Sequence, residues 1–175
     1  CHHPEIEEFL EIRKASGDFN RKSLNLHHGI NITDAFMEAV RADEDFGLIS
    51  PKSGEIVRTI NARKLWQKIL ELRMQTGEPY LLFTDTVNNS MPAHQRKLGL
   101  KVTQSNLCSE ITLPTGIDHR GQDRTAVCCL SSVNAEKFME WSKDEHFLED
   151  IFRFLDNVLE DFIERAPPEM ARAVY

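Results

Sequence analysis

Apolar side chains recur every three or four residues in three stretches of the chain, which is the spacing of a helix with one buried face. The stretches are residues 4–15, residues 61–76 and a long run from about 144 to 165. Asn61 can cap the second helix at its start and Gly77 can end it. Thr33 is a cap candidate for a shorter helix, and another short helix is predicted from residue 135.

Strands are predicted between these helices. Residues 24–30 alternate between apolar and polar, residues 46–50 and 55–60 flank a Pro-Lys-Ser-Gly turn as in a hairpin, and residues 80–83 form a continuous apolar run. Residues 84–105 are predicted to be mostly loop, with a helical turn near 94–98. Residues 102–111 and 125–133 are predicted to be extended. Helices that alternate with strands indicate an α/β fold.

Composition adds constraints on function. The chain has 175 residues with 21 Lys and Arg against 28 Asp and Glu, a net charge of −7. The acidic balance argues against a nucleic-acid partner, because that affinity comes mainly from basic side chains on phosphates. No apolar run approaches the roughly 18 to 20 residues that span a bilayer, and the first residues do not resemble a signal peptide. We therefore expect a cytoplasmic protein that contacts no membrane.

Cysteine and histidine usage points to chemistry at a thiol and not to a metal site. The four cysteines are too few for a disulfide scaffold and form no C-x-x-C pair: Cys1, Cys108, Cys128 and Cys129. The paired histidines at 2–3 and 27–28 would point apart on a strand, so we expect no metal ligands among them. A start at Cys1 in place of Met implies processing, a split gene or a fragment.

Residues 105–111, Ser-Asn-Leu-Cys-Ser-Glu-Ile, are the most informative stretch. If this segment is extended, Asn106, Cys108 and Glu110 face one side, and they bring an amide, a thiol and a carboxylate together. Such a trio can orient a substrate hydroxyl, do sulfur chemistry and move a proton. The simpler alternative is that Cys108 is a small buried apolar residue.

A second cysteine stretch covers residues 125–134, Thr-Ala-Val-Cys-Cys-Leu-Ser-Ser-Val-Asn. Neighbouring residues of a strand face opposite sides, so only one of Cys128 and Cys129 can share a pocket with Cys108. The composition leaves open which one.

Together the two stretches resemble the catalytic subunit of class I ribonucleotide reductase, and the similarity runs over nearly the whole chain. The resemblance implies a segment of a ten-stranded α/β barrel, with a central finger loop at about 103–112, a second cysteine strand at about 125–133 and the long helix at about 144–165. It implies that Cys108 carries the thiyl radical, that Glu110 takes the proton of the 3′-hydroxyl, and that Asn106 hydrogen-bonds the substrate. Cys128 matches a reducing cysteine, whereas Cys129 falls where the family usually has Asn or Thr.

The polar stretch at about 14–22 resembles the family's substrate-specificity loop. The ordinary alternative is a surface loop that only connects two elements. The resemblance implies that the loop responds to dNTP or ATP effectors bound at the interface of a homodimer. Arg21 and Lys22 are the expected contacts to base or phosphate, and Gly17 gives the backbone its freedom.

The resemblance also implies partners. They are a ribonucleoside diphosphate substrate, thioredoxin or glutaredoxin as reductant, and a separate small subunit whose diiron or dimanganese centre generates the radical. This chain itself is expected to bind no cofactor. The chain lacks the family's other reducing cysteine, phosphate-binding loop and radical-relay tyrosines, so we expect it to need the remaining segments of the large subunit and to have no turnover alone.

Two other classes of function stay open. A noncatalytic interaction module derived from the same barrel would bind partners without using Cys108, Glu110 or Cys128. A cysteine hydrolase would require a base near Cys108, and the local motif supplies no histidine for that role.

Overall fold

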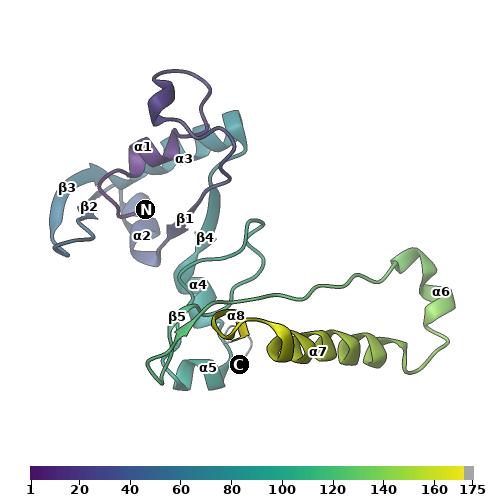
Figure 1. Cartoon of the computed structure of the whole chain (residues 1–175). Coiled ribbons are helices and arrows are strands. Elements are labelled where there is room, and N and C mark those ends of the chain that lie inside the picture. The colour runs from purple at the N-terminus through teal and green to yellow at the C-terminus, as the bar shows by residue number, and fades with distance from the viewer. Residues whose placement is uncertain (172–175) are drawn as a thin grey trace. The chain divides into compact units, whose positions relative to one another are not determined.

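The computed structural model describes residues 1–171, which form a mixture of helices and short strands. The chain divides into two compact units, Cys1–Leu113 and Pro114–Tyr175, and each is described by itself. Figure 1 shows the course of the chain, with most of its elements labelled.

The first unit contains two small sheets and most of the helices. Strands β1 (Gly29–Ile32) and β4 (Tyr80–Phe83) pair in parallel, and β2 (Asp45–Ile49) and β3 (Ile56–Asn61) form an antiparallel hairpin. The helical elements are α1 (Ile6–Leu10), η1 (Phe19–Arg21), α2 (Asp34–Ala42), α3 (Ala62–Thr76), α4 (Thr84–Asn89) and α5 (Ala93–Lys97).

Local sequence signals explain where the central helices begin and end. The Thr33 hydroxyl accepts a hydrogen bond from the Phe36 amide at 3.2 Å, and the Asn61 side chain accepts one from the Lys64 amide at 2.9 Å. Gly77 ends α3 with a positive φ of 77°, a conformation that glycine adopts without strain. These features confirm the predicted helix caps, and the predicted hairpin and the strand at 80–83 are also confirmed.

One face of the parallel pair builds the core. Ile30 and Ile32 of β1 are almost fully buried and belong to a cluster with α1, α2 and α3. Side chains alternate along a strand, so Gly29, Asn31, Tyr80 and Leu82 occupy the opposite face. The cluster consists of Cys1, Ile6, Leu10, Ile30, Ile32, Phe36, Leu48, Ala62, Leu65, Ile69 and Leu72. The core therefore leaves the second face of this sheet free to line a site.

Three predictions for the first unit are corrected. The helix at 4–15 is regular only over Ile6–Leu10, because the loop that follows takes its last carbonyls: Lys22 Nζ donates to Glu11 O and the Ser23 amide donates to Ile12 O. The strand predicted at 24–30 begins at Gly29, where parallel pairing with Tyr80 starts. Residues 84–89 form α4 and not a loop.

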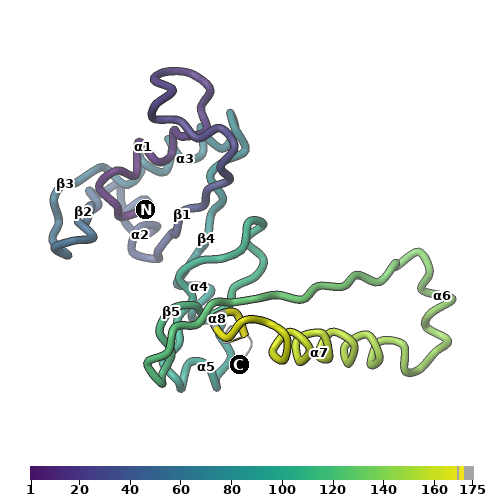
Figure 2. Tube along the Cα trace, in the orientation of Figure 1, coloured from purple at the N-terminus to yellow at the C-terminus, as the bar shows by residue number. Residues whose placement is uncertain are grey.

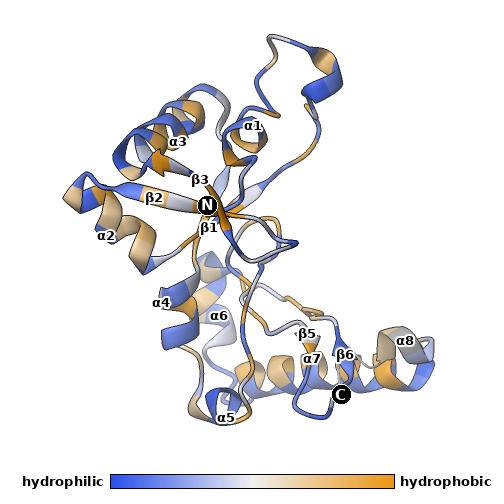
Figure 3. Ribbon diagram, turned by 90° about the vertical axis from the view of Figure 1, so that its left-hand side faces the viewer, coloured by the Kyte–Doolittle hydropathy of each residue, from blue (hydrophilic) through white to orange (hydrophobic). Residues whose placement is uncertain are grey.

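The second unit contains a small hairpin and a long helix. The hairpin pairs β5 (Gly116–Ile117) with β6 (Asp123–Arg124), and the helices are η2 (Ala135–Lys137), α6 (Phe138–Trp141), α7 (Phe147–Arg165) and α8 (Pro168–Ala171). Figure 3 shows hydrophobic residues distributed along α7 between hydrophilic ones. None of the residues of α7 is buried, although its pattern predicted a core-facing stripe.

Residues 125–133 form no regular strand, contrary to the prediction. A strand needs a neighbour for its backbone hydrogen bonds, and none of the segments that the structure describes pairs with these residues. Figure 2 shows the irregular course of the chain between α5 and η2, interrupted only by the short hairpin.

The sheets do not close. Within residues 1–171 there are three two-stranded sheets and no closed barrel, so the α/β character is confirmed while the complete barrel is not formed by this chain. None of the helices in the described part is long and apolar enough to cross a membrane.

Candidate functional site

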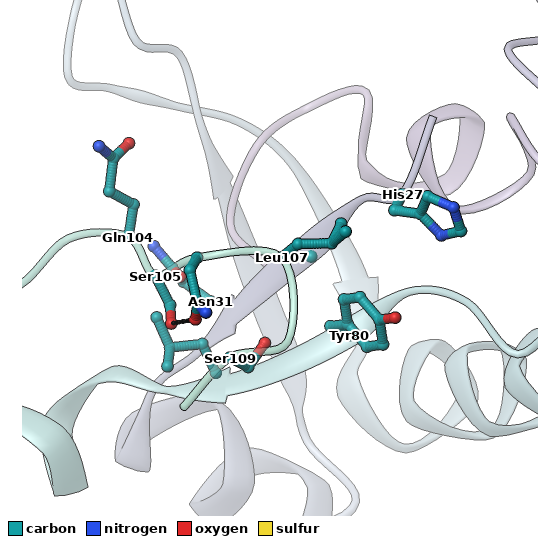
Figure 4. Close-up of a pocket in the computed structure, with 10 residues that line it drawn as sticks. His27, Asn31, Tyr80, Gln104, Ser105, Leu107 and Ser109 are labelled. Atoms are coloured by element: carbon teal, nitrogen blue, oxygen red, sulfur yellow. Dashed lines mark hydrogen bonds between the residues drawn. The ribbon is translucent and has the colours of Figure 1, made fainter. Parts of the chain in front are cut away.

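A cavity of about 330 Å³, lined by polar and apolar groups, lies in the first unit between the free face of the β1–β4 pair and the predicted finger loop. Figure 4 shows residues of the two strands and of the loop around it. The strands contribute polar, aromatic and apolar side chains, and the loop contributes two amides, two hydroxyls and a leucine. The lining residues are His27, Gly29, Asn31, Tyr80, Leu82, Gln104, Ser105, Asn106, Leu107 and Ser109.

Side-chain amides anchor the start of the loop. Asn88 of α4 accepts a hydrogen bond from the Val102 amide and donates one to the Val102 carbonyl, both at 2.9 Å. Asn31 of β1 donates to the Thr103 carbonyl, also at 2.9 Å. The loop is therefore fixed to α4 and to the sheet face before it reaches the cavity.

The tip of the loop is closed by its own polar groups. The Asn106 side-chain oxygen accepts a hydrogen bond from the Ile111 amide at 3.0 Å, and the Ser105 hydroxyl donates to the Ile111 carbonyl at 2.7 Å. The Ser109 amide donates to the Asn106 carbonyl, and Ser109 has a positive φ of 66°. These bonds close a tight turn, and Cys108 is one of the residues that form this turn.

The turn changes how the three motif residues lie. Asn106 lines the cavity, whereas Cys108 and Glu110 are exposed and are not among its lining residues. The strict alternation that would place all three on one side requires an extended chain, and the positive φ at Ser109 interrupts it. The roles of Cys108 and Glu110 therefore stay predictions.

The second cysteine stretch belongs to the second unit. Cys128 is exposed and Cys129 is half-buried. Because Cys108 lies in the first unit, the proximity of the sulfurs of Cys108 and Cys128 also stays a prediction.

The predicted specificity loop lies against α1 and borders a charged pocket of about 550 Å³. Arg21 Nε lies 3.6 Å from a carboxylate oxygen of Glu8, and Lys22 Nζ donates to the Glu11 carbonyl at 3.1 Å. Gly17 has a φ of 94°, which only glycine adopts easily. A hydrogen bond from Lys68, opposed in part by burial, lowers the pKa of the Glu11 carboxyl.

Sequence reasoning missed one pair at the cavity. His27 Nδ1 and Glu78 Oε1 are 2.6 Å apart, and Glu78 is buried at 3% exposure. The sequence drew attention to His27 only as a metal ligand, and its distance of 51 residues from Glu78 gives no local signal. In the part of the chain that the structure describes, no group of three or more His, Cys, Asp or Glu could hold a metal ion.

Comparison with known proteins identifies the family. The family described as ribonucleotide reductase, barrel domain, matches residues 1–172. A protein of Frog virus 3 (isolate Goorha) whose name contains the words ribonucleoside-diphosphate reductase large subunit is 52% identical over 98% of this chain and 30% of its own length. The ribonucleoside-diphosphate reductase large subunit of Invertebrate iridescent virus 3 is 38% identical over 99% of this chain and 35% of its own length.

The chain thus belongs to the ribonucleotide reductase barrel-domain family, and the resemblance seen in the two cysteine stretches is confirmed. It spans about a third of the length of these two relatives, 30% and 35% respectively.

Proposed function

We propose that this chain is the part of a ribonucleotide reductase large subunit that carries the radical cysteine, and that the complete protein reduces ribonucleoside diphosphates to 2′-deoxyribonucleoside diphosphates. The observation that carries the proposal is the family match over residues 1–172, which includes the Ser-Asn-Leu-Cys-Ser-Glu-Ile motif. The loop that bears this motif is anchored beside a cavity, and this arrangement supports the proposal.

The proposed chemistry uses a radical and a pair of thiols. Cys108, as a thiyl radical, takes the hydrogen atom from C3′ of the ribose, and Glu110 takes the proton of the 3′-hydroxyl. The 2′-hydroxyl then leaves as water. Two electrons come from Cys128 and a second cysteine outside this chain, which become a disulfide, and the C3′ hydrogen returns from Cys108 to the sugar.

Asn106 is proposed to hold the substrate by hydrogen bonding. Its side-chain oxygen is already engaged by the Ile111 amide, so the side-chain NH₂ is the group that this role requires. A loop already closed in this way positions the amide without further loss of conformational freedom.

The partners follow from the same proposal. The remaining segments of the large subunit complete the ten-stranded barrel and supply the second thiol. A separate small subunit with a diiron or dimanganese centre generates the radical, and thioredoxin or glutaredoxin reduces the disulfide. The 14–22 loop takes part in the response to dNTP or ATP effectors in a homodimer, with Gly17 as the flexible point and Arg21 and Lys22 as contacts.

Replacement of Cys108 in the complete, assembled enzyme tests the proposal. We expect Cys108→Ala to abolish the formation of deoxycytidine diphosphate from cytidine diphosphate (CDP), while CDP binding stays largely intact. Cys129→Ala is the matched control and should retain most of the activity, because Cys129 is proposed to be only a neighbour. Undiminished turnover in Cys108→Ala would show that the assignment of Cys108 as the radical residue is wrong. The 175-residue chain alone is expected to form no deoxynucleotide.

A further inference from the structure

A buried carboxylate holds a histidine at one end of the cavity. His27 Nδ1 lies 2.6 Å from Glu78 Oε1, and the two side chains are 46% and 4% exposed respectively. A hydrogen bond this short to a buried carboxylate fixes the orientation of the imidazole ring. His27 is thus an oriented polar group of the cavity and not a freely rotating surface side chain.

The backbone around the pair is also fixed. The Glu78 amide donates to the Thr76 hydroxyl at 3.1 Å, and that hydroxyl donates to the Leu72 carbonyl of α3 at 2.8 Å. On the other side, the Tyr80 amide donates to the His28 carbonyl at 2.8 Å where the β1–β4 pairing begins. The pair therefore stands on the ends of regular elements, which hold a site more accurately than a free loop does.

The Glu78 contact decides which ring nitrogen of His27 a ligand can use. In the neutral ring, Nδ1 carries the proton that is donated to the carboxylate, so Nε2 is the acceptor. No hydrogen bond to Nε2 is found among the residues that the structure describes. A ligand group with an O–H donor is the natural partner for this nitrogen.

The neighbouring histidine cannot play the same part. His28 is 4% exposed and its ring packs edge-on against Phe9, with ring centroids 4.9 Å apart. Figure 4 shows His27 and Tyr80 at one end of the cavity and Gln104 and Ser105 at the other. His27 thus lies at the end of the cavity opposite the amide and hydroxyl groups of the loop.

We propose that His27 contacts the bound ligand by accepting a hydrogen bond from a sugar hydroxyl of the nucleotide, and that Glu78 is its positioning residue. The inference rests on the proposed function, because the ribonucleoside diphosphate is the ligand that carries these hydroxyls. The cavity volume of about 330 Å³ is at the lower end of the range for small-molecule sites, which suits a sugar better than a whole dinucleotide.

Binding of two ligands that differ only in the sugar hydroxyls tests the contact. The probes are CDP and 2′,3′-dideoxy-CDP, titrated by calorimetry into the complete, assembled large subunit, which supplies the segments that this chain lacks. We expect His27→Phe to weaken CDP binding by about 5- to 10-fold and to leave dideoxy-CDP binding unchanged, as the loss of one hydrogen bond predicts. His94→Phe, at an exposed histidine outside the cavity, is the matched control and should change neither affinity.

A second variant tests the positioning role of Glu78. Glu78→Gln keeps an acceptor oxygen but loses the charge that fixes the histidine tautomer. We expect the ring ¹⁵N shifts of His27 to change from those of a single Nδ1–H form to those of a mixture, with CDP binding weakened by about 2- to 5-fold. A backbone amide spectrum of each variant verifies that the fold is retained.

The outcomes separate this inference from the proposed function. If the wild-type large subunit binds CDP but His27→Phe binds both ligands normally, or loses both equally, the hydroxyl contact is wrong and the proposed function stands. Unchanged ¹⁵N shifts in Glu78→Gln would overturn the positioning role alone. A wild-type large subunit that binds neither ligand contradicts the proposed substrate site and, with it, the role of His27.

Discussion

Asp118 illustrates how a single carboxylate can organise a turn. It is only 7% exposed, and its oxygens accept hydrogen bonds from the Arg120 and Gln122 amides and from Arg124 Nε, at 2.8, 2.9 and 2.6 Å. The Gln122 amide and Arg124 stabilise the charged form most, and they lower the pKa of Asp118 from 3.8 to about 2. We therefore expect the β5–β6 hairpin to be more stable when Asp118 is charged.

This depressed pKa has a defined consequence for stability. Since the folded carboxyl binds its proton less readily than the unfolded one, its contribution is complete above pH 3.8 and is lost as the pH falls through about 2. We expect the ¹³C carboxyl shift of Asp118, followed by NMR, to titrate with a midpoint near 2, and hydrogen-exchange protection of the hairpin to fall over the same interval.

Arg124→Gln provides the comparison for this titration. It removes the cationic partner while the Gln122 amide still donates, so the midpoint should rise but remain below the ordinary value of 3.8. A wild-type midpoint at 3.8 would show that the charged form is not selectively stabilised.

At the scale of elements, the sequence predicted those helix ends that are determined by contacts between residues close together in the chain. Thr33, Asn61 and Gly77 mark helix ends by bonds or backbone angles within a few residues, and each was predictable. Helix α4 was missed because contacts from far along the chain support it: Asp85 accepts from the Asp34 amide, and Asn88 bonds to Val102. Short helices of this kind carry little periodicity of their own.

The candidate site likewise contains features that the sequence predicted and features that depend on contacts it did not reveal. The importance of residues 105–111 was visible in the sequence, but the turn at Ser109 was not, because two of the bonds that close it join side chains to backbone groups. The pair of His27 and Glu78 was also hidden, since only the parallel pairing of β1 with β4 brings these residues together.

The anchoring of the loop by α4 leads to a second prediction. Asn88 makes three side-chain hydrogen bonds at 2.8 to 2.9 Å, two of them to Val102. Asn88→Ala leaves the Val102 amide and carbonyl without these partners, and Val102 is 3% exposed. We expect a loss of about 1–3 kcal/mol in the free energy of unfolding, measured by urea denaturation, and faster hydrogen exchange at the Val102 amide.

Asn89→Ala is the matched control for this prediction. Asn89 occupies the same helix and is exposed, and its side chain makes no hydrogen bond within the part that the structure describes. Its replacement should change the free energy of unfolding by less than about 0.5 kcal/mol. Equal losses of unfolding free energy in the two variants would mean that the helix propensity of α4 causes the effect and that the hydrogen bonds between Asn88 and Val102 do not.

For the whole molecule, buried surface is unevenly distributed between the long helices. Helix α3 buries Leu65, Ile69 and Leu72, and each such side chain contributes about 1.5–3 kcal/mol. Helix α7 buries none of its residues, and Phe152 and Phe154 are 71% and 63% exposed. The sequence correctly predicted the apolar stripe of α7. Such a stripe indicates that one face of the helix is suited to burial, but it does not indicate which segment covers that face.

This difference predicts unequal hydrogen exchange in the chain. A helix without buried contacts opens locally at little cost, so the amides of α7 should exchange with low protection while those of α3 approach the protection of global unfolding. Hydrogen-exchange mass spectrometry of the 175-residue chain at neutral pH measures both helices in one experiment. Helix α2, which buries only Phe36, should be intermediate and serves as the internal standard.

The complete protein provides the decisive comparison. The relatives are about three times as long as this chain, which spans 30% and 35% of them, so further segments are expected to cover the stripe of α7. Protection of α7 should then rise strongly in the complete large subunit, whereas that of α3 should change little because its partners are already present. If α7 were as well protected in the 175-residue chain as α3, its stability would not depend on missing partners, and the incomplete-barrel interpretation would lose its physical basis.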